Sequence, residues 1–318
     1  MFPFSFNRSG ILGINARNLD YLFPNNPRRL YSLADSKLET KKIAQELDVP
    51  VPETYGVVTF QNEVKNIAEA IGDRHSFVIK PARGSGGDGI LVIKDVVESG
   101  YQKASGAIIK PDDLKYHIYN ILGGMYSLSG NKDVAIIEAA VEFAEVFNDI
   151  AYQGVPDIRV ITYHGVPAMA MLRLPTKVSD GKANLHRGGV GAGIDLKTGR
   201  TTSAIQNNRY IDQHPETGHS LHGCQIPHWQ TILEMAAKLG DKTEFGYLGV
   251  DIVLDKLKGP LLLEINARPG ISIQIANGEG LIGRLETIDQ ALSKLSGIDE
   301  KIEFAQKAFA TDYISLDR

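Results

Sequence analysis

Residues 249–266 read GVDIVLDKLKGPLLLEIN, two apolar runs joined by a short polar turn. Side chains alternate along a strand, so Glu264 and Asn266 share one face, and the turn brings Asp251 beside them. Oxygen-bearing side chains of this kind are ligands that Mg²⁺ prefers. The competing interpretation is a set of ordinary polar residues on the exposed face of a hairpin, although Asp and Asn are depleted in strands. The pattern therefore predicts a metal site, with Arg268 at its mouth.

A glycine-rich segment lies upstream, between two other apolar runs. It reads KPARGSGGDG over residues 80–89, and glycine lets backbone N–H groups approach an anion closely. It is not a Walker loop, because the Lys-Ser/Thr ending is missing and no helix follows directly. Lys80 ends a buried strand and therefore needs an anionic partner. The segment predicts a phosphate-binding hairpin, although a glycine-rich hairpin alone is weak support.

The first clear helix signal is Ser36-Lys37-Leu38-Glu39, which fits a capping box. Lys37 falls in the first turn of this helix, where the helix dipole disfavours a cation. Taken alone, it reads most simply as a solvated surface lysine. The preceding thirty-odd residues carry clusters of Asn, Arg and Pro and are expected to be irregular.

The remaining pattern alternates strands with single helices. Apolar runs predict strands at residues 77–80, 90–93, 134–137, 158–163, 166–172, 247–254 and 261–266, and a helix at residues 228–239. Strands paired by short turns and interrupted by single helices indicate an α+β fold and not a doubly wound sheet.

The composition excludes several classes of protein. A chain of 318 residues is long enough for two or three subdomains. A net charge of −4 argues against a general nucleic-acid binder. Cys224 is the single cysteine, so no internal disulfide can form. No stretch reaches the roughly 20 apolar residues of a membrane span, and the start does not resemble a signal peptide. We expect a cytoplasmic protein without membrane insertion or a nucleic-acid partner.

Together these pieces resemble the ATP-grasp superfamily, and within it the alpha-L-glutamate ligase-related (RimK-like) proteins. The likeness spans about residues 35–275 and is carried by five stretches: Asp35-Ser36-Lys37-Leu38, Val78-Ile79-Lys80-Pro81, Asp157-Ile158-Arg159-Val160, Asn184-Leu185-His186-Arg187-Gly188-Gly189 and Glu264-Ile265-Asn266-Ala267-Arg268-Pro269-Gly270. The fourth stretch is the most specific to the glutamate-ligase branch. The resemblance implies an ATP-grasp fold, in which two α+β subdomains grip ATP.

The resemblance also implies roles at the matching positions. Arg159 would meet the γ-phosphate and then the acyl phosphate, with Asn184, Arg187 and Arg268 toward the substrate end. The metal ligands Asp251, Glu264 and Asn266 would hold two Mg²⁺ ions, with Mn²⁺ as an alternative. The nucleotide-binding set would comprise Lys37, Lys80, Gly84, Ser85, Gly86, Gly87, the hinge residues Glu138, Ala140 and Val141, and Glu145 near the ribose.

One departure from the family concerns the N-terminal domain that usually helps to bind the carboxylate substrate. Only about 34 residues precede the first clear helix here. We therefore expect a truncated N-terminal remnant at residues 1–34, a lid subdomain with the glycine-rich hairpin at 35–141, and a catalytic subdomain with the metal site at 142–318. Either residues 11–18 keep a remnant of the substrate site, or a partner protein or second copy completes it.

The implied reaction is ATP-dependent joining of a carboxylate, such as glutamate, to an amine or peptide. Phosphoryl transfer depends mainly on positioning and charge neutralisation, which the metal site and Arg159 would supply. One alternative is an ATP-grasp phosphotransferase that phosphorylates a hydroxyl, with His186 as a base. A second is a non-catalytic nucleotide-binding subunit, which is disfavoured because the candidate metal ligands are all present.

A histidine-rich segment contains His214, His219, His222, Cys224 and His228. Its spacing fits no zinc pattern. We expect a polar loop here, which could line the amine-acceptor pocket.

Overall fold

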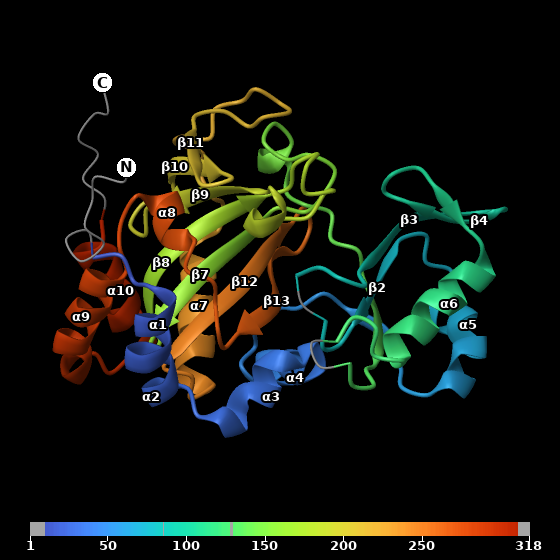
Figure 1. Ribbon diagram of the computed structural model, residues 1–318, viewed down its shortest axis with the longest axis horizontal. Coiled ribbons are helices and arrows are strands. Elements are labelled where there is room, and N and C mark those ends of the chain that lie inside the picture. Colours follow the sequence, from blue (N-terminus) through green and yellow to red (C-terminus); the bar gives the residue numbers. More distant parts are fainter. Residues whose placement is uncertain (1–9, 85, 128–129, 311–318) are drawn as a thin grey trace.

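The computed structural model describes residues 10–84, 86–127 and 130–310, and within them the strands form two antiparallel sheets (Figure 1). The smaller sheet has the order β1-β6-β2-β3-β4-β5 and the larger β11-β10-β9-β8-β7-β12-β13. The smaller sheet contains β1 (Thr54–Val58), β2 (Phe77–Pro81), β3 (Leu91–Val97), β4 (Gly100–Lys103), β5 (Ile108–Ile109) and β6 (Ala135–Glu138). The larger contains β7 (Asp157–Tyr163), β8 (Val166–Leu174), β9 (Val190–Ile194), β10 (Thr201–Gln206), β11 (Arg209–Ile211), β12 (Tyr247–Asp255) and β13 (Gly259–Asn266).

Helices flank both sheets, and the two lobes lie beside one another in Figure 1. Their bounds are α1 (Ile14–Ala16), α2 (Phe23–Asn25), α3 (Tyr31–Asp35), α4 (Lys37–Glu46), α5 (Ile67–Ile71), α6 (Pro111–Leu122), α7 (Trp229–Lys242), α8 (Ile273–Asn277), α9 (Ile282–Ala291) and α10 (Ile298–Ala308). Among the described helices, each is too short or too polar to cross a bilayer.

The smaller sheet is covered by α6, whose sequence explains its packing. Pro111 stands at the start of the helix, where a missing N–H costs nothing. Its buried residues Leu114, Ile118, Ile121 and Leu122 repeat with helical spacing, so they form one apolar stripe. This stripe joins Phe77 and Ile79 of β2 in the lobe's hydrophobic core.

The larger sheet forms the second core. Strands β7, β8 and β12 are buried along almost their whole length, which explains why their sequences are continuous apolar runs. Helix α7 packs against β7, β8 and β12, and α10 packs beside α7. The tight hairpin of β7 and β8 turns at His164 and Gly165, as predicted. The strand and helix predictions are confirmed to within a few residues.

The prediction of an irregular N-terminal segment is wrong. Residues 14–25 form consecutive helical turns, and α3 follows before α4. Such short helices need tertiary contacts, and Asn26 supplies them. Its Nδ2 donates to the carbonyls of Tyr247 at 2.7 Å and Ala267 at 2.8 Å. These contacts dock the segment onto the β12–β13 end of the larger sheet.

The proposed subdomain boundaries remain a prediction. Strands β1 to β6 fall within residues 35–141, and β7 to β13 within residues 142–318. Helix α4, however, packs against β13 of the larger sheet. The chain therefore crosses from the larger lobe to the smaller one after α4 and returns after β6.

Candidate functional site

A cavity of about 1490 Å³ is lined by residues from both sheets. Among the predicted site residues, Ser85 lies outside the described part of the chain, and Arg187, which is described, does not line the cavity. The predicted residues on the wall are Lys37, Lys80, Gly84, Gly86, Gly87, Glu138, Ala140, Val141, Glu145, Arg159, Asn184, Asp251, Glu264, Asn266 and Arg268.

The acidic end of the cavity is built on the β12–β13 hairpin. Asp251 stands opposite Glu264 in the ladder, and Gly249 opposite Asn266, with a register shift after Asp251. Asn266 Nδ2 lies 3.1 Å from Asp251 Oδ2 and 3.4 Å from Glu264 Oε1. The predicted convergence of these three side chains is therefore confirmed as geometry.

Two arginines, one on the adjacent strand β7 and one on the next strand β8, neutralise Asp251. Arg159 of β7 donates from Nε to Asp251 Oδ1 at 2.7 Å and from Nη2 to Oδ2 at 2.5 Å. Arg173 of β8 lies with Nη2 at 2.8 Å from the same Oδ2. Burial alone would raise the pKa of Asp251, but the two guanidiniums hold that pKa well below its usual range.

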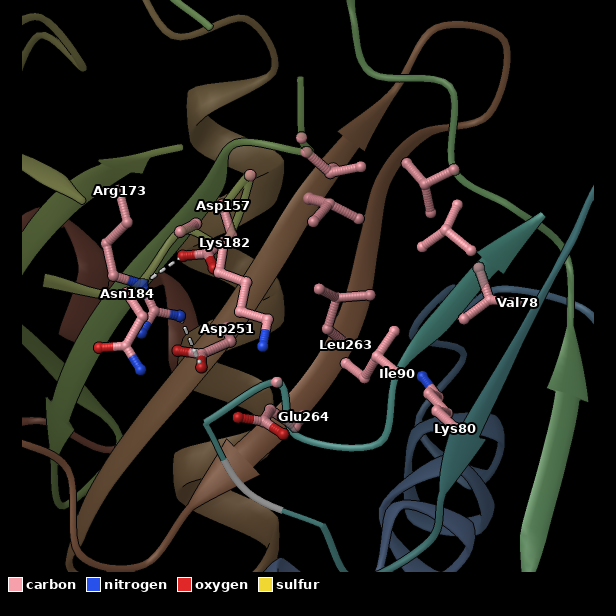
Figure 2. A pocket seen from close by; sticks show the side chains of 18 of the residues that line it. Val78, Lys80, Ile90, Asp157, Arg173, Lys182, Asn184, Asp251, Leu263 and Glu264 are labelled. Atoms are coloured by element: carbon pink, nitrogen blue, oxygen red, sulfur yellow. Dashed lines mark hydrogen bonds and ion pairs between the residues drawn. The ribbon is translucent and has the colours of Figure 1, made fainter. Parts of the chain in front are cut away.

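Arg173 also pairs with Asp157, so it bridges two buried carboxylates (Figure 2). Burial raises the pKa of Asp157 to about 7, although Arg173 opposes the shift, and the charge of Asp251 adds to it. Burial lowers the pKa of Arg173, but the two carboxylates outweigh this and raise it. The sequence analysis assigned no role to either residue. Arg173 could have been found as Lys80 was, because each is a cationic residue within an otherwise apolar strand, β8 and β2.

Glu264 also pairs with a largely buried cation, Lys37. Lys37 Nζ lies 3.2 Å from Glu264 Oε2 and donates to the carbonyl of Gly84 at 2.7 Å. The carboxylate explains how a lysine is tolerated at the first position of α4, against the helix dipole. Lys37 is therefore not a solvated surface lysine.

The oxygen-bearing side chains at the acidic end of the cavity differ in how accessible they are to Mg²⁺. Glu264 is the more accessible carboxylate, because its side chain is 29% exposed, and Lys37 lies close to Oε2. Asn266 offers Oδ1 if its amide makes a half-turn. Asp251 is 1% exposed, and its oxygens are taken by two guanidiniums and an amide. A metal ion would have to displace a guanidinium to reach it. The described residues hold no group of three or more His, Cys, Asp or Glu side chains arranged for a metal.

The opposite end of the cavity combines an apolar slot with a buried charge triad. Val78, Ile90 and Leu263 lie around the slot, with Lys80 beside it (Figure 2). The anionic partner that Lys80 requires is Glu138 of β6. Lys41 of α4, which the sequence analysis missed, lies with Nζ 2.6 Å from the same carboxylate. The triad fixes the first residue of the predicted hinge.

The glycine-rich hairpin joins β2 to β3 and reaches the larger lobe through Asp88. Arg187 Nη2 donates to Asp88 Oδ1 at 2.7 Å and to Oδ2 at 2.9 Å. Lys182 Nζ lies 3.7 Å from Oδ1. Arg187 thus contacts the hairpin rather than the cavity. Gly89 has φ +73°, and a Cβ there would lie 2.6 Å from the Tyr126 ring, so only glycine fits.

Two further predicted residues lie at the rim. Arg268 stacks over the Tyr31 ring, 4.8 Å from its centroid, and pairs with Asp35 at 3.1 Å. Glu145 is exposed and pairs with Lys256 at 2.8 Å. Asn184 lies on the cavity wall, and its Oδ1 accepts from the backbone N–H of His186 at 3.0 Å.

The histidine-rich segment contacts the loop that follows β8, at Pro175 and Lys177. The buried His214 holds Nε2 at 3.1 Å from the Pro175 carbonyl, a contact that requires an N–H on that nitrogen. Glu216 Oε1 accepts from the backbone N–H of Lys177 at 3.1 Å. Over the part of the chain that the structure describes, this segment offers no cluster suited to zinc. The geometry agrees with a polar loop.

Comparison with known protein families places the chain among ATP-grasp sequences. The sequence model of the sugar-transfer associated ATP-grasp family matches residues 16–290. No curated protein sequence matches the chain. Similar solved structures include the ATP-grasp ligase PsnB complexed with a minimal precursor, at 12% identity and a TM-score of 0.45, covering 85% of this chain and 64% of that one.

Two other solved structures are similar at comparable levels. The D-cycloserine synthetase DcsG is 16% identical, with a TM-score of 0.46 over 84% of this chain and 72% of that chain. A RimK domain ATP-grasp protein from Sphaerobacter thermophilus is 13% identical, with a TM-score of 0.45 over 82% of this chain and 70% of that one. The chain spans less than two thirds of the length of PsnB.

Proposed function

The chain belongs to the sugar-transfer associated ATP-grasp family, and on that basis we propose that it is an ATP-dependent carboxylate–amine ligase. The observation that supports the proposal most directly is the cavity lined by residues of both sheets. It has an apolar slot at one end, and carboxylates with two arginines at the other. A nucleotide that spans the cavity has its base in the slot and its phosphates near the acidic end.

The nucleotide end has groups of the required kinds. Val78, Ile90 and Leu263 offer apolar contact to a base. The backbone of Ala140 and Val141 lies on the same wall and offers the polar contacts of a hinge. Lys80 and the glycine-rich hairpin supply a cation and backbone donors for phosphate oxygens.

The metal end fits Mg²⁺, with Glu264 and Asn266 as first ligands and Asp251 as a further ligand once an arginine moves. Mg²⁺ bound there supplies positive charge to the phosphate oxygens. We propose two ions, with Mn²⁺ as a substitute. Arg159 and Arg173 add guanidinium forks, which match phosphate and carboxylate geometry.

The proposed chemistry has two steps. A substrate carboxylate oxygen attacks the γ-phosphorus of ATP, ADP leaves, and an acyl phosphate forms. The amine then attacks the acyl carbon, phosphate leaves with the electron pair of the broken C–O bond, and the amine loses a proton to give an amide. Arg159 contributes charge stabilisation as the phosphoryl group is transferred, which is where preorganised donors have their largest effect.

The substrates are proposed as classes. Glutamate remains our first carboxylate, and an amine or a peptide our first acceptor. Because the matching family is associated with sugar transfer, we add amines carried on a sugar to the proposed acceptor classes. We propose that residues 11–18 complete the substrate site within the chain, and a contact of Arg17 supports this: its Nη1 donates to the Pro269 carbonyl at 2.7 Å, next to Arg268.

An ADP-release screen over carboxylates and amines, with mass detection of products, tests the proposal. A ligase gives an amide, ADP and phosphate. A phosphotransferase gives a phosphate ester and ADP, and it stays the second candidate because the exposed His186 lies on the cavity wall. ATP binding without any product would favour a non-catalytic subunit and contradict both enzymes.

A further inference from the structure

Lys37 is held between two groups that belong to different parts of the site. Its Nζ lies 3.2 Å from Glu264 Oε2 on β13 and donates to the Gly84 carbonyl of the glycine-rich hairpin at 2.7 Å. The side chain is only 11% exposed. A neighbouring void of about 20 Å³, lined by Lys37, Gly84, Asp88 and Glu264, has room for about one water. The ammonium therefore lies beside Glu264, with room for about one water next to it.

The position of Lys37 is unfavourable without that carboxylate. It is the first residue of α4, where the helix dipole presents partial positive charge. Glu264 offsets both the dipole and the cost of removing the ammonium from water. A divalent cation on the Glu264 carboxylate would repel the ammonium from Oε2. Lys37 and a metal ion thus compete for one carboxylate.

The second contact connects this competition to the hairpin. Lys37 contacts the hairpin at its base, where Nζ donates to the Gly84 carbonyl and the backbone N–H donates to the Ala82 carbonyl at 2.9 Å, whereas Asp88 contacts the larger lobe through half-exposed Arg187. Exposed ion pairs contribute little. The buried lysine is therefore the stronger connection between the hairpin and the acidic end of the cavity.

We propose that Lys37 is a positioning residue that couples metal binding at Glu264 to the glycine-rich hairpin. In the metal-free protein it neutralises Glu264 and holds Gly84 down. When a divalent cation binds Glu264, the ammonium withdraws and the hairpin loosens, which opens the cavity to the nucleotide. Asp251 is neutralised by Arg159 and Arg173 in the same way. The inference rests on the proposed function only in that Glu264 binds the metal.

Hydrogen exchange with Mg²⁺ alone, in the absence of nucleotide, tests this coupling. The readout is the peptide that covers residues 82–91, in wild type, Lys37→Met and Lys42→Met. Lys42 is the matched control, because it lies on the same helix but is 65% exposed and pairs with Glu39. We expect Mg²⁺ to speed exchange in wild type and Lys42→Met by about tenfold, the effect of losing one charge-assisted hydrogen bond. Lys37→Met should exchange fast without metal and not respond to it.

A second measurement uses Mn²⁺ as the probe, with free Mn²⁺ followed by electron paramagnetic resonance. Lys37→Met should bind Mn²⁺ severalfold more tightly than wild type, because the competing ammonium is gone. Wild-type exchange that is unchanged or slowed by Mg²⁺, or weaker Mn²⁺ binding by Lys37→Met, overturns the inference. These readouts involve no ligation. A phosphate ester in the product screen would therefore overturn the ligase proposal and leave this coupling standing.

Discussion

Replacing Glu138 with glutamine tests the charge triad that fixes the nucleotide end of the cavity. Glu138 is 3% exposed, and its carboxylate lies between Lys80 and Lys41, with Lys41 Nζ at 2.6 Å. Burial would raise the pKa of Glu138, but the two lysines outweigh it and lower that pKa. Glu138→Gln keeps the shape of the side chain and leaves two buried ammonium groups without a counter-charge.

The expected loss follows from that imbalance. Removing one partner of a buried ion pair costs about 3 to 5 kcal/mol of unfolding free energy, and here two cations lose the same partner. Burial already lowers the pKa of Lys41, and Glu138 opposes this shift. In the variant the pKa of Lys41 falls further, so the lysine releases its proton more readily in the folded state. The difference from wild type should therefore shrink as the pH rises from 7 toward 10.

Urea unfolding followed by circular dichroism, at pH 7 and pH 9, measures both effects. Glu145→Gln is the matched control, because Glu145 lies on the wall of the same cavity but pairs with Lys256 in solvent. It should change stability little. If Glu138→Gln lost no more stability than this control, or lost the same amount at both pH values, the triad would not support the nucleotide end as argued.

Four further predictions concern the acidic end and the hairpin. Arg159→Lys should lower kcat about a hundredfold with little change in KM, because its contact strengthens as charge develops; steady-state kinetics measure this. Glu264→Gln should abolish turnover while circular dichroism shows a folded protein, although Tm should fall because Lys37 loses its counter-charge. Arg187→Ala should raise KM for ATP a few-fold and leave kcat almost unchanged, because it contacts the hairpin and not the cavity. In EDTA, the Tm of Asp157→Asn minus the Tm of wild type should increase as the pH rises from about 4 to about 7. The reason is that the pKa of Asp157 is raised from 3.8 to about 7 by folding, so its ionisation costs stability across that window.

Each of these predictions has a contradicting result. Equal small changes in kcat and KM for Arg159→Lys would show that Arg159 does not stabilise the transition state. Full activity in folded Glu264→Gln would show that Glu264 is not an essential metal ligand. A large fall in kcat for Arg187→Ala would place that arginine at the reacting atoms. A Tm difference for Asp157→Asn that does not vary with pH would mean that Asp157 is already ionised.

The sequence was most informative where local periodicity determines geometry. Alternation along residues 249–266 was enough to place Asp251, Glu264 and Asn266 together, because the pleat and a tight turn leave few other arrangements. The ATP-grasp assignment made from the motifs is confirmed by the family match. Lys80 was likewise expected to have an anionic partner, since a buried ammonium group requires one.

The sequence was least informative about partners that are distant along the chain. Lys41 meets Glu138 across 97 residues, and Arg187 meets Asp88 across 99. Neither pairing follows from spacing or propensity. The N-terminal helical turns were missed for a related reason, because they depend on the contacts of Asn26 with Tyr247 and Ala267 rather than on their own sequence.

The proposed reaction is phosphorylation of a carboxylate by ATP, followed by its joining to an amine. It is tested most directly by supplying the carboxylate found in the screen with ¹⁸O in both oxygen atoms, and analysing the released phosphate by mass spectrometry. An acyl phosphate intermediate transfers one carboxylate oxygen, so each phosphate should carry one ¹⁸O atom and the amide should keep the other. Unlabelled phosphate beside an amide, or label retained in a phosphate ester, would contradict the account.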